Sequence, residues 1–298
     1  MHLTRPLEWT KSFGNMVIGS AMAFYAFNAY FDLWLFFTGF ISVAFLWSGL
    51  YTLNDFTDFR HDALHPVKKN RPIPSGKVKP NAALIVSLGL IAFSFALGLK
   101  INLFFVFCLA AMTFNQLLYT LEPFSLKKRP VLDLISGSLI NPFFRFYAGW
   151  TLFVPAFNAP LLAIAFILGI QFGGYSLYRL ASKSHEEKLG YKSSVVLFGE
   201  KNIKLAAYTA ILIGILSFIM LTINDIAFPE LSFLGVLPFR FILLAFGSLA
   251  LLPFYLNSLK DPKKADIQKL YRMIYIHYLL FIIGFILLWA FFPIELKV

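Results

Sequence analysis

The sequence predicts an all-α integral membrane protein with about nine transmembrane helices and a cytoplasmic N-terminus. Three observations lead to this prediction. Hydrophobic residues make up 59% of the 298 residues and charged residues only 14%, whereas soluble domains have about 45–50% and about 25%. Several segments are long and apolar enough to span a bilayer. Most Lys and Arg residues fall in alternate loops between those segments, which indicates their orientation.

Each expected span is a run of about 20 mostly apolar residues, the length that an α-helix needs to cross the hydrocarbon core. The expected spans are residues 13–31, 33–53, 81–99, 101–119, 132–153, 157–178, 204–223, 235–256 and 274–293. The fifth is the weakest of these, because Asn141 and Arg145 interrupt its apolar run. The longest polar interruptions all fall on one face, so we expect residues 1–298 to form a single membrane-embedded domain.

The net charge of +11 records orientation and does not indicate nucleic-acid binding. With the N-terminus on the cytoplasmic side, the opposite face keeps only Lys100, Arg240 and Lys297, while Arg145 lies inside a span. This asymmetry follows the positive-inside rule. We therefore expect the lipid bilayer as the environment and no nucleic-acid partner. The single cysteine, Cys108, falls within an apolar run and indicates a packed thiol, not a disulfide or a thiolate metal site.

Three carboxylates follow directly after the second apolar run. On a helix, Asp55, Asp58 and Asp62 occupy positions i, i+3 and i+7 and share one face, which Asn54 borders. Like charges this close repel one another, and near a membrane interface each also costs desolvation free energy. One interpretation is a solvated loop start whose charge is balanced by Arg60, Lys68, Lys69 and Arg71. We favour a Mg²⁺ site, because Mg²⁺ binds one or two carboxylates together with waters and phosphate oxygens.

The basic residues that come next are compatible with a phosphate ligand. Lys69 and Arg71 are expected to contact phosphate oxygens, Arg through its planar fork and Lys as a point charge. The "RPIPSG" run around them predicts a rigid turn that leads into the third span.

The two stretches "NDFTDFRHD" and "KKNRPIPSG" together resemble the first signature of the UbiA superfamily of intramembrane prenyltransferases, N-D-x-x-D-x-x-x-D with a downstream N-R-P-x-x-S-G. Every signature position is filled, by Asn54, Asp55, Asp58, Asp62, Asn70, Arg71, Pro72, Ser75 and Gly76. The expected nine spans also match that family, so the resemblance covers nearly the whole chain.

This resemblance implies a fold and an activity. The fold is a single helical bundle with a central cavity, and loops 54–80 and 179–203 form a polar cap over the active site on the cytoplasmic face. The activity is Mg²⁺-dependent transfer of a polyprenyl group from an isoprenoid diphosphate to a lipophilic, membrane-embedded acceptor, either aromatic or lipid-like.

The second signature of the family, D-x-x-x-D-x-x-x-G, is altered in this chain. The run "GYKSSVVLFG" from Gly190 resembles the family and fixes the register, so the two aspartate positions fall on Ser182 and Glu186. Glu186 can still bind a metal, whereas Ser182 is a weak, neutral ligand. Arg179 and Lys183 flank the altered site, and we expect them to bind phosphate directly. Their positive charges would then replace part of the charge neutralisation that a second metal ion would provide.

This departure leaves a second activity open. The decaprenyl-phosphate phosphoribosyltransferases of the same superfamily keep the first acidic motif but diverge at the second. Their activity, phosphoribosyl transfer from phosphoribosyl diphosphate to a polyprenyl phosphate, is the alternative for this chain. We rank it second, because "GYKSSVVLFG" resembles the prenyltransferases proper.

Polar residues inside expected spans are functional candidates. Asn115 and Tyr119 lie one helical turn apart in the fourth span, where Tyr119 could orient a phosphate or face a developing allylic cation. Asn141 and Arg145 are expected to face the interior of the bundle. Their alternative role is an interhelical hydrogen-bond pair that holds the helices together.

Two non-enzymatic classes agree less well with the sequence. Carriers often contain internal repeats with helices interrupted near the midplane, whereas the acidic clusters here lie at helix ends on one face. A non-catalytic lipid-binding relative is supported only by Ser182, and the complete first signature argues against it.

The residues expected to take part in the reaction fall into three groups. The catalytic residues are Asp55, Asp58, Asp62 and Tyr119. The expected metal ligands are Asp55, Asp58, Asp62 and Glu186. The substrate-binding residues are Asn54, Lys69, Arg71, Asn115, Arg145, Arg179, Ser182 and Lys183.

Overall fold

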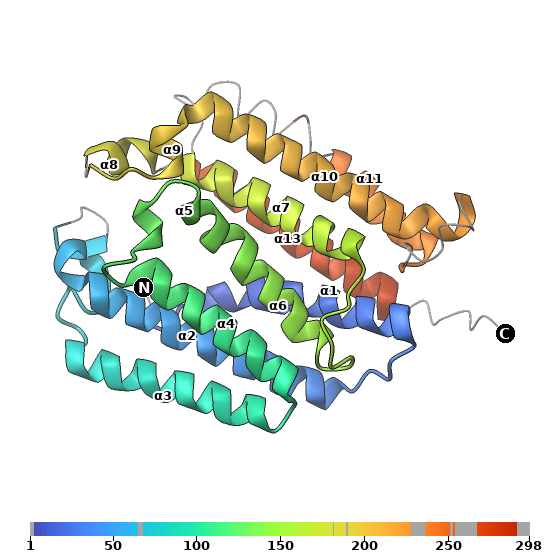
Figure 1. The fold of residues 1–298 in the computed structure, drawn as a ribbon, viewed down its shortest axis with the longest axis horizontal. Helices are drawn as coiled ribbons and strands as arrows, with labels where there is room; N and C mark the ends of the chain where they lie inside the picture. Colours follow the sequence, from blue (N-terminus) through green and yellow to red (C-terminus); the bar gives the residue numbers. More distant parts are fainter. Residues whose placement is uncertain are drawn as a thin grey trace. The chain divides into compact units, whose positions relative to one another are not determined.

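The computed structural model describes residues 3–64, 68–180, 182–188, 190–227, 236–250, 253 and 267–290. Within these residues every regular element is a helix, which confirms the predicted all-α class (Figure 1). The chain divides into two compact units, which we describe separately. The first unit comprises Met1–Ser20, Ala29–Lys128 and Ile140–Phe157, and the second comprises Ala21–Asn28, Arg129–Leu139 and Asn158–Val298.

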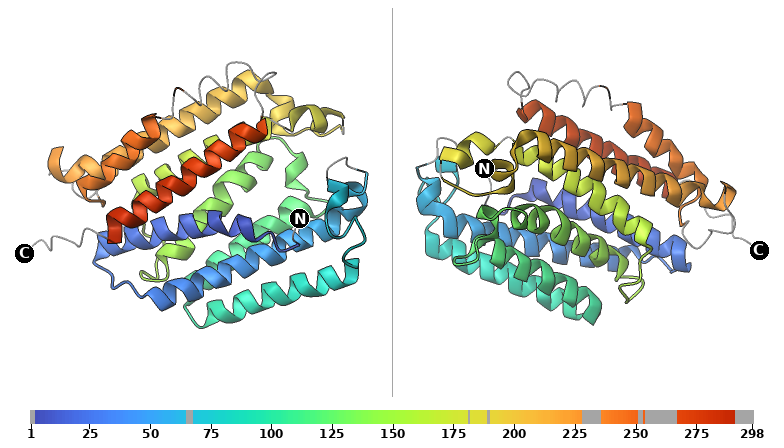
Figure 2. Two further views of the ribbon diagram at one scale, coloured as in Figure 1. Left: turned by 180° about the vertical axis from the view of Figure 1, so that it is seen from behind. Right: turned by 45° about the horizontal axis from the view of Figure 1, so that its top comes forward.

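The first unit is built around four long helices and one shorter one. Its elements are the 3₁₀ turn η1 (Pro6–Glu8), most of α1 (Trp9–Phe27), α2 (Leu33–Asp62), η2 (Lys68–Asn70), α3 (Pro80–Leu99), α4 (Leu103–Thr120), η3 (Leu126–Lys128) and α6 (Asn141–Trp150). Helices α2 and α3 pack along most of their length, and both views of Figure 2 show them side by side.

The second unit contains the remaining helices. Its elements are the end of α1, α5 (Leu132–Ile135), most of the π-helical turn η4 (Ser136–Ile140), α7 (Leu161–Leu180), α8 (Lys183–Lys188), α9 (Ser194–Leu197), α10 (Gly199–Ala227), η6 (Phe239–Phe241), α11 (Ile242–Ala250) and α13 (Ile267–Ala290). Helices α7 and α10 form the main packed pair of this unit.

Local sequence signals explain where several helices of the first unit begin. The carboxylate of Asp32 accepts a 2.8 Å hydrogen bond from the backbone N–H of Trp34 at the start of α2. Helix α3 starts with Pro80, whose missing N–H costs nothing in a first turn. At the start of α4, the side chain of Asn102 accepts a 2.8 Å hydrogen bond from the N–H of Phe105.

Helix α2 continues beyond its apolar run. The expected span ends at residue 53, but the helix extends to Asp62 because no Gly or Pro interrupts residues 50–62. The three carboxylates therefore lie on one continuous helix, as their spacing predicts.

The fifth expected span, 132–153, forms three short pieces: α5, η4 and α6. Pro142 lies in the first turn of α6 and has no N–H to donate to the preceding turn, so the regular α-helical hydrogen bonds stop there. The π-helical turn lies immediately before this position. The polar residues that interrupt this expected span therefore coincide with a real break in the helix.

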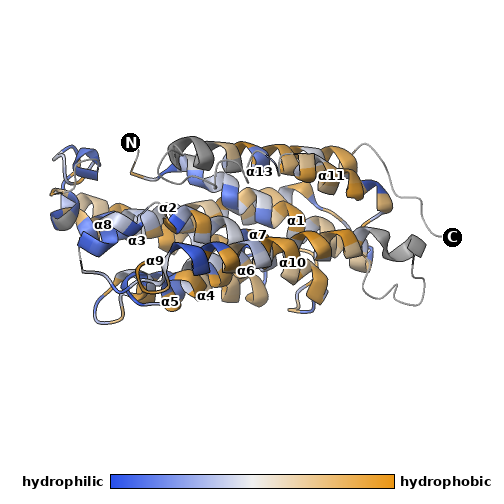
Figure 3. Ribbon diagram, turned by 90° about the horizontal axis from the view of Figure 1, so that it is seen from above, coloured by the Kyte–Doolittle hydropathy of each residue, from blue (hydrophilic) through white to orange (hydrophobic). Residues whose placement is uncertain are grey.

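Five helices in the described part of the chain are long and apolar enough to cross a membrane. They are Leu33–Arg60, Pro80–Leu99, Leu103–Thr120, Leu161–Leu180 and Gly199–Thr222. Two shorter apolar helices are Phe239–Ala250 and Tyr275–Ala290. Figure 3 shows mostly hydrophobic residues along α10 and hydrophilic ones on α8. The eighth and ninth expected spans lie partly outside the described residues, which include neither 254–256 nor 291–293.

Helices within each unit approach closely where small residues meet. Apolar side chains are as well solvated by lipid tails as by each other, so helices in a membrane associate through close packing and interhelical hydrogen bonds. A Cβ atom on Gly149 of α6 would lie 2.1 Å from the backbone O of Met16 in α1. Beside it, Ser20 Oγ donates a 2.9 Å hydrogen bond to Gly149 O. Between α2 and α3, Ser87 Oγ donates to Gly49 O at 2.8 Å.

The contact at Gly149 predicts the effect of a small substitution. We expect Gly149→Ala to lower the midpoint of thermal unfolding in detergent, because the new methyl group would meet backbone atoms that cannot rotate away. Overpacking of this kind costs about 1–3 kcal/mol. The matched control is Gly89→Ala on α3, where a Cβ atom meets nothing within 4 Å. Equal unfolding midpoints for the two variants would contradict this packing.

Candidate active site

One guanidinium group bridges two carboxylates on the acidic face of α2. Arg71 Nη1 donates one hydrogen bond to Asp55 Oδ1 at 3.0 Å and another to Asp62 Oδ2 at 2.6 Å. Both carboxylates are buried, with 2% of Asp55 and 4% of Asp62 exposed. One nitrogen atom of Arg71 therefore lies between two of the three carboxylates expected to bind metal.

Other cations complete the charge balance around these carboxylates. Arg5 forms an ion pair with Asp55. Lys68 Nζ lies 3.7 Å from Asp62, and Lys127 Nζ donates to both oxygens of Asp58 at 2.8 and 2.9 Å. We call these seven side chains the acidic cluster: Arg5, Asp55, Asp58, Asp62, Lys68, Arg71 and Lys127. Among the residues that the structure describes, its three carboxylates have four cationic partners, so the cluster carries one excess positive charge.

The sequence predicted the carboxylates and Arg71, and it included Lys68 among the basic residues that could balance them, but it did not predict Arg5 and Lys127 as partners. Lys69, which was expected to bind phosphate, is exposed, and its neighbour Lys68 contacts the carboxylate instead. Arg5 and Lys127 belong to basic segments that the positive-inside rule already places on the same face as the carboxylates. The positive-inside rule was the only sequence signal for these two cations, because spacing along the sequence does not connect a cation in a loop with one particular carboxylate.

The acidic cluster agrees with a Mg²⁺ site in its donor chemistry. Hard carboxylate oxygens are the protein ligands that Mg²⁺ prefers. Asp55 and Asp62 already converge on one point, which the Arg71 nitrogen occupies, whereas Asp58 contacts Lys127. Within the described ranges, no group of three or more His, Cys, Asp or Glu side chains is arranged to hold a metal ion. A metal would therefore have to replace Arg71 between the two carboxylates.

Polar side chains continue from the cluster along α4 and α6. Thr120 Oγ1 donates to Asn54 Oδ1 at 3.0 Å, which joins α4 to α2. Asn115 Nδ2 donates to Asn141 Oδ1 at 2.8 Å, which joins α4 to α6. Asn141 thus has the interhelical role that the sequence left open, with Asn115 as its partner. Tyr119 lies half-buried on the same helix.

A second set of charges lies in the second unit, centred on Arg179 at the end of α7. Its Nη2 atom donates to Asp133 Oδ2 at 3.2 Å and to Glu186 Oε2 at 2.9 Å, while its Nη1 atom lies 2.9 Å from Glu186 Oε1. Ser182 Oγ donates to Glu186 Oε1 at 2.6 Å, and Ser193 Oγ donates to Glu186 Oε2. Both carboxylate oxygens of Glu186 therefore accept from protein donors.

Asp133 is even more completely enclosed. Its side chain is fully buried, and it accepts hydrogen bonds from Ser194 N at 3.1 Å, from Ser194 Oγ and from Leu134 N at 3.0 Å. We call Asp133, Arg179, Ser182, Glu186, Ser193 and Ser194 the Arg179 cluster. The roles of Ser193 and Ser194 were not predicted, although both lie in the run that fixed the family register. Lys183, an expected phosphate ligand, lies 3.6 Å from Glu187 in an exposed pair.

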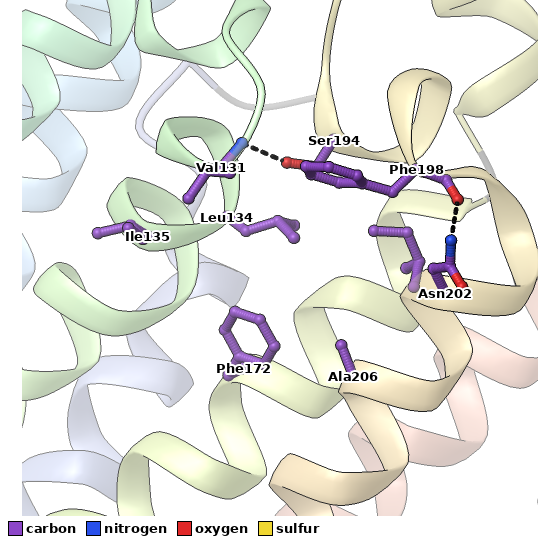
Figure 4. Close-up of a pocket in the computed structure, with 9 residues that line it drawn as sticks. Val131, Leu134, Ile135, Phe172, Ser194, Phe198, Asn202 and Ala206 are labelled. Carbon is purple, nitrogen blue, oxygen red and sulfur yellow. Dashed lines mark hydrogen bonds between the residues drawn. The ribbon is translucent and has the colours of Figure 1, made fainter.

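An apolar pocket of about 300 Å³ lies beside the Arg179 cluster within the second unit. Figure 4 shows Leu134 and Phe172 beside this pocket, with Ser194 and Asn202 at its edge. The backbone N–H of Val131 donates to Ser194 Oγ at 2.7 Å, so Ser194 contacts both the cluster and the wall of the pocket.

The fold and these sites define a helical protein with apolar helices of membrane-spanning length and charged clusters at helix ends. The chain belongs to the UbiA prenyltransferase family, whose pattern it matches over residues 15–279. This match confirms the resemblance found in the signature motifs.

Individual relatives agree with the family assignment. The chain is 30% identical to the 4-hydroxybenzoate octaprenyltransferase of Aeromonas salmonicida over 176 residues, which cover 56% of this chain and 57% of that protein. It therefore spans little more than half the length of that relative. A digeranylgeranylglyceryl phosphate synthase of Methanopyrus kandleri is 27% identical over 222 residues, or 73% of this chain and 76% of the relative. Both names are those of prenyl-transferring enzymes, which does not favour the phosphoribosyl alternative.

Solved structures show the same fold. A UbiA homologue from Archaeoglobus fulgidus, bound to DMAPP and Mg²⁺, superposes with a TM-score of 0.73 at 21% identity, covering 97% of this chain and 98% of that one. The same homologue bound to GPP and Mg²⁺ gives a TM-score of 0.71 at 20% identity, covering 96% and 99% of the two chains. At this level of identity the likeness establishes the fold alone.

The Arg179 cluster predicts a large loss of stability when its cation is removed. We expect Arg179→Met to lower the thermal unfolding midpoint in detergent strongly, because two buried carboxylates lose their shared partner. Breaking a buried pair costs about 3–5 kcal/mol. The matched control, Lys183→Met, removes a half-exposed pair worth about 0–1 kcal/mol. A midpoint for Arg179→Met as high as that of the control would show that the cluster contributes nothing to folding.

Proposed function

We propose that this protein catalyses Mg²⁺-dependent transfer of a polyprenyl group from an isoprenoid diphosphate to a membrane-embedded acceptor, either aromatic or lipid-like. The observation that carries the proposal is the convergence of Asp55 and Asp62 on one nitrogen of Arg71, at the end of an apolar helix long enough to span a membrane. A water-soluble diphosphate headgroup and a buried isoprenoid chain would meet at such a place.

The proposed membrane organisation follows from the sequence. It has nine spans, a cytoplasmic N-terminus, cytoplasmic loops 54–80 and 179–203 beside the active site, and a central cavity for the isoprenoid chain. Five apolar helices of spanning length and the family assignment support the membrane setting. The distribution of Lys and Arg supports the orientation.

In this proposal the acidic cluster holds the donor. Asp55, Asp58 and Asp62 would hold Mg²⁺, which neutralises negative charge on the departing diphosphate. A metal–diphosphate group would displace Arg71 and Lys127 from the carboxylates, and both cations would then contact phosphate oxygens. The charges would stay paired in this exchange, because the carboxylates would pair with the metal and the displaced cations with the phosphate oxygens.

The transfer itself breaks one bond and forms another. The C1–O bond of the isoprenoid diphosphate breaks, and its electron pair stays on the diphosphate oxygen. A carbon or oxygen nucleophile of the acceptor forms a new bond to C1, and its proton passes to the released diphosphate or to water. The cationic partners of the cluster stabilise the developing anion. We assign Tyr119 to the allylic cation, where cation–π attraction is worth about 0.5–2 kcal/mol, and the apolar surroundings exclude water that would quench that cation.

We further propose that the acidic cluster binds the metal without help from Glu186. The expected ligand set included Glu186, but its two oxygens accept from Arg179, Ser182 and Ser193. In this proposal Arg179 and Glu186 hold the loop between α7 and α10 in place, and Ser182 belongs to the same network.

Activity measurements with three variants test the proposal. Purified protein is given radiolabelled geranylgeranyl diphosphate, Mg²⁺ and a lipid extract, and labelled lipid is counted. We expect Asp58→Asn to lower kcat roughly 100-fold or more, by the loss of charge that positions the metal and diphosphate. Glu186→Gln should lower the thermal unfolding midpoint but keep the Mg²⁺ concentration for half-maximal activity within about two-fold.

The control for these variants is Glu187→Gln, which removes an exposed carboxylate beside the same loop and should behave like the wild type. A parallel assay offers labelled phosphoribosyl diphosphate in place of geranylgeranyl diphosphate. Full activity of Asp58→Asn, or labelled product formed only from phosphoribosyl diphosphate, would contradict the proposed function. A large rise in the Mg²⁺ concentration that Glu186→Gln needs for half-maximal activity would indicate that Glu186 is a metal ligand.

A further inference from the structure

The apolar pocket of the second unit has no role in the proposed transfer, and Ser194 connects it with the Arg179 cluster. Its volume of about 300 Å³ lies at the lower end of the range for ligand-binding pockets. Of the described residues that line it, only Ser194 and Asn202 are polar. Ligand pockets are mostly apolar and contain a few polar groups that fix the orientation of the ligand. This pocket therefore has the composition expected of a site for a hydrocarbon chain with one polar end.

The polar and apolar parts of the pocket lie at different depths along two helices of spanning length. Helices α7 and α10 are joined by the short segment 181–198 and pack along their length, so the end of α7 and the start of α10 lie at the same end of the pair. Ser194 and Asn202 lie at this end, whereas Ala206 lies about 6 Å further along α10 than Asn202. Phe172 lies about 12 Å from the end of α7. Figure 4 shows Phe172 and Ala206 on the side of the pocket opposite Ser194. A chain that enters beside the polar residues would therefore run towards the middle of both helices.

The polar end of the pocket is surrounded by positive charge. The backbone N–H of Val131 donates to Ser194 Oγ at 2.7 Å, which holds two segments of this end together. The carboxylate of Glu200, in the first turn of α10, is already paired with Lys204. Three exposed cations lie within two residues of lining residues: Arg129 before Val131, Lys192 before Ser194 and Lys201 before Asn202.

The two carboxylates beside the pocket already have protein partners. Asp133 is fully buried and accepts hydrogen bonds from Ser194, while both oxygens of Glu186 accept from protein donors. In the proposed function an isoprenoid diphosphate binds through Mg²⁺ at the acidic cluster, so this pocket is left to a headgroup that needs no metal. A single phosphate group is such a headgroup, because Lys and Arg bind it directly.

We propose that this pocket is a lipid-binding site that takes one acyl chain of a membrane phospholipid with an anionic headgroup. The phosphate contacts the three exposed cations, and the chain extends from Ser194 and Asn202 towards Phe172. In the proposed orientation these helix ends face the cytoplasmic leaflet, whose anionic lipids attract basic segments close to the membrane. The inference does not rest on the proposed transfer, because it concerns a separate pocket within the second unit.

Occupancy of this site stabilises the loop that closes the Arg179 cluster. Ser194 lies in that loop, where its hydroxyl group donates to Asp133 and accepts from the N–H of Val131. A ligand that binds the folded protein and not the unfolded chain raises the stability of the folded state. An anionic phospholipid should therefore raise the thermal unfolding midpoint in detergent more than a neutral phospholipid with the same chains.

A photolabelling competition locates the site. The purified protein is mixed with a trace of phosphatidylglycerol that carries a photoreactive group in one acyl chain, together with excess unlabelled phosphatidylglycerol or phosphatidylcholine. We expect phosphatidylglycerol to suppress labelling of residues 131–135 and 202–206 at least about five-fold more than phosphatidylcholine does, a ratio that corresponds to about 1 kcal/mol. Residues 212–216, an exposed part of the same helix, are the internal control and should respond equally to both lipids. Equal suppression by both lipids at the pocket overturns the inference.

Two further competitors distinguish a phospholipid from other occupants. Glycerol phosphate has the headgroup chemistry without the chains and should leave the labelling unchanged. Geranylgeranyl diphosphate should suppress the labelling less than phosphatidylglycerol does at the same concentration. Suppression by glycerol phosphate as strong as that by phosphatidylglycerol would show a site for free phosphate. Stronger suppression by geranylgeranyl diphosphate would assign the pocket to the isoprenoid substrate, and either result overturns the inference.

A pocket-filling variant tests the position of the chain. Ala206→Phe places a ring at the apolar end of the pocket and should lower the phosphatidylglycerol-sensitive labelling of residues 131–135 at least about five-fold. The matched control is Leu205→Phe, at a 65% exposed position beside it that does not line the pocket, and its labelling should equal that of the wild type. Unchanged labelling of Ala206→Phe overturns the inference.

A charge variant tests the position of the headgroup. The double variant Lys192→Gln, Lys201→Gln should lose the preference for phosphatidylglycerol over phosphatidylcholine. The matched control is the double variant Lys77→Gln, Lys79→Gln, which removes two exposed cations of the first unit and should keep the preference. An unchanged preference in the first double variant overturns the inference. If Ala206→Phe does not fold, this comparison and the competition with the wild-type protein decide.

Discussion

The structure depends on the neutralisation of three carboxylates at the end of a membrane-length helix. Asp55 and Asp62 share one nitrogen of Arg71, and Asp58 pairs with Lys127. Buried carboxylates need partners of opposite charge, or the segment that carries them would not fold in this environment. Arg5 contributes from the start of the chain. These ion pairs therefore connect the N-terminal segment, the turn after α2 and the segment after α4 to one helix end. They also bring together the groups that would bind a metal and a diphosphate in the proposed function.

The two charged clusters differ in how firmly they are closed. In the acidic cluster, Lys127 and Asp58 keep 17% and 24% of their side chains exposed, so their pair can exchange partners with solvent or a ligand. In the Arg179 cluster, Asp133 is fully buried, and serine hydroxyl groups and backbone N–H groups complete its contacts and those of Glu186. Ion pairs that can be exchanged suit a binding site, whereas fully satisfied buried networks make the surrounding structure rigid. The altered second signature agrees with this division of roles.

Much of the fold follows from the length and apolar character of single segments, and these were predicted well. The expected span 81–99 matches α3 within one residue at its start, and 101–119 differs from α4 by at most two residues at either end. Contacts between distant segments were harder to predict, because spacing along one helix says nothing about cations in other loops. The ion pairs of Arg5 and Lys127 and the bonds of Ser194 to Asp133 were therefore missed. The resemblance supplied the carboxylates that we expect to bind metal but not the partners that hold them.

The central claim is that Arg71 occupies the place of the metal and gives it up when the donor binds. A structure of the protein determined with Mg²⁺ and an uncleavable sulfur analogue of an isoprenoid diphosphate tests this claim directly. The account predicts Mg²⁺ about 2.0–2.1 Å from oxygens of Asp55 and Asp62, with Arg71 moved onto a phosphate oxygen. Mg²⁺ bound to Glu186, with Arg71 still bridging Asp55 and Asp62, would contradict it.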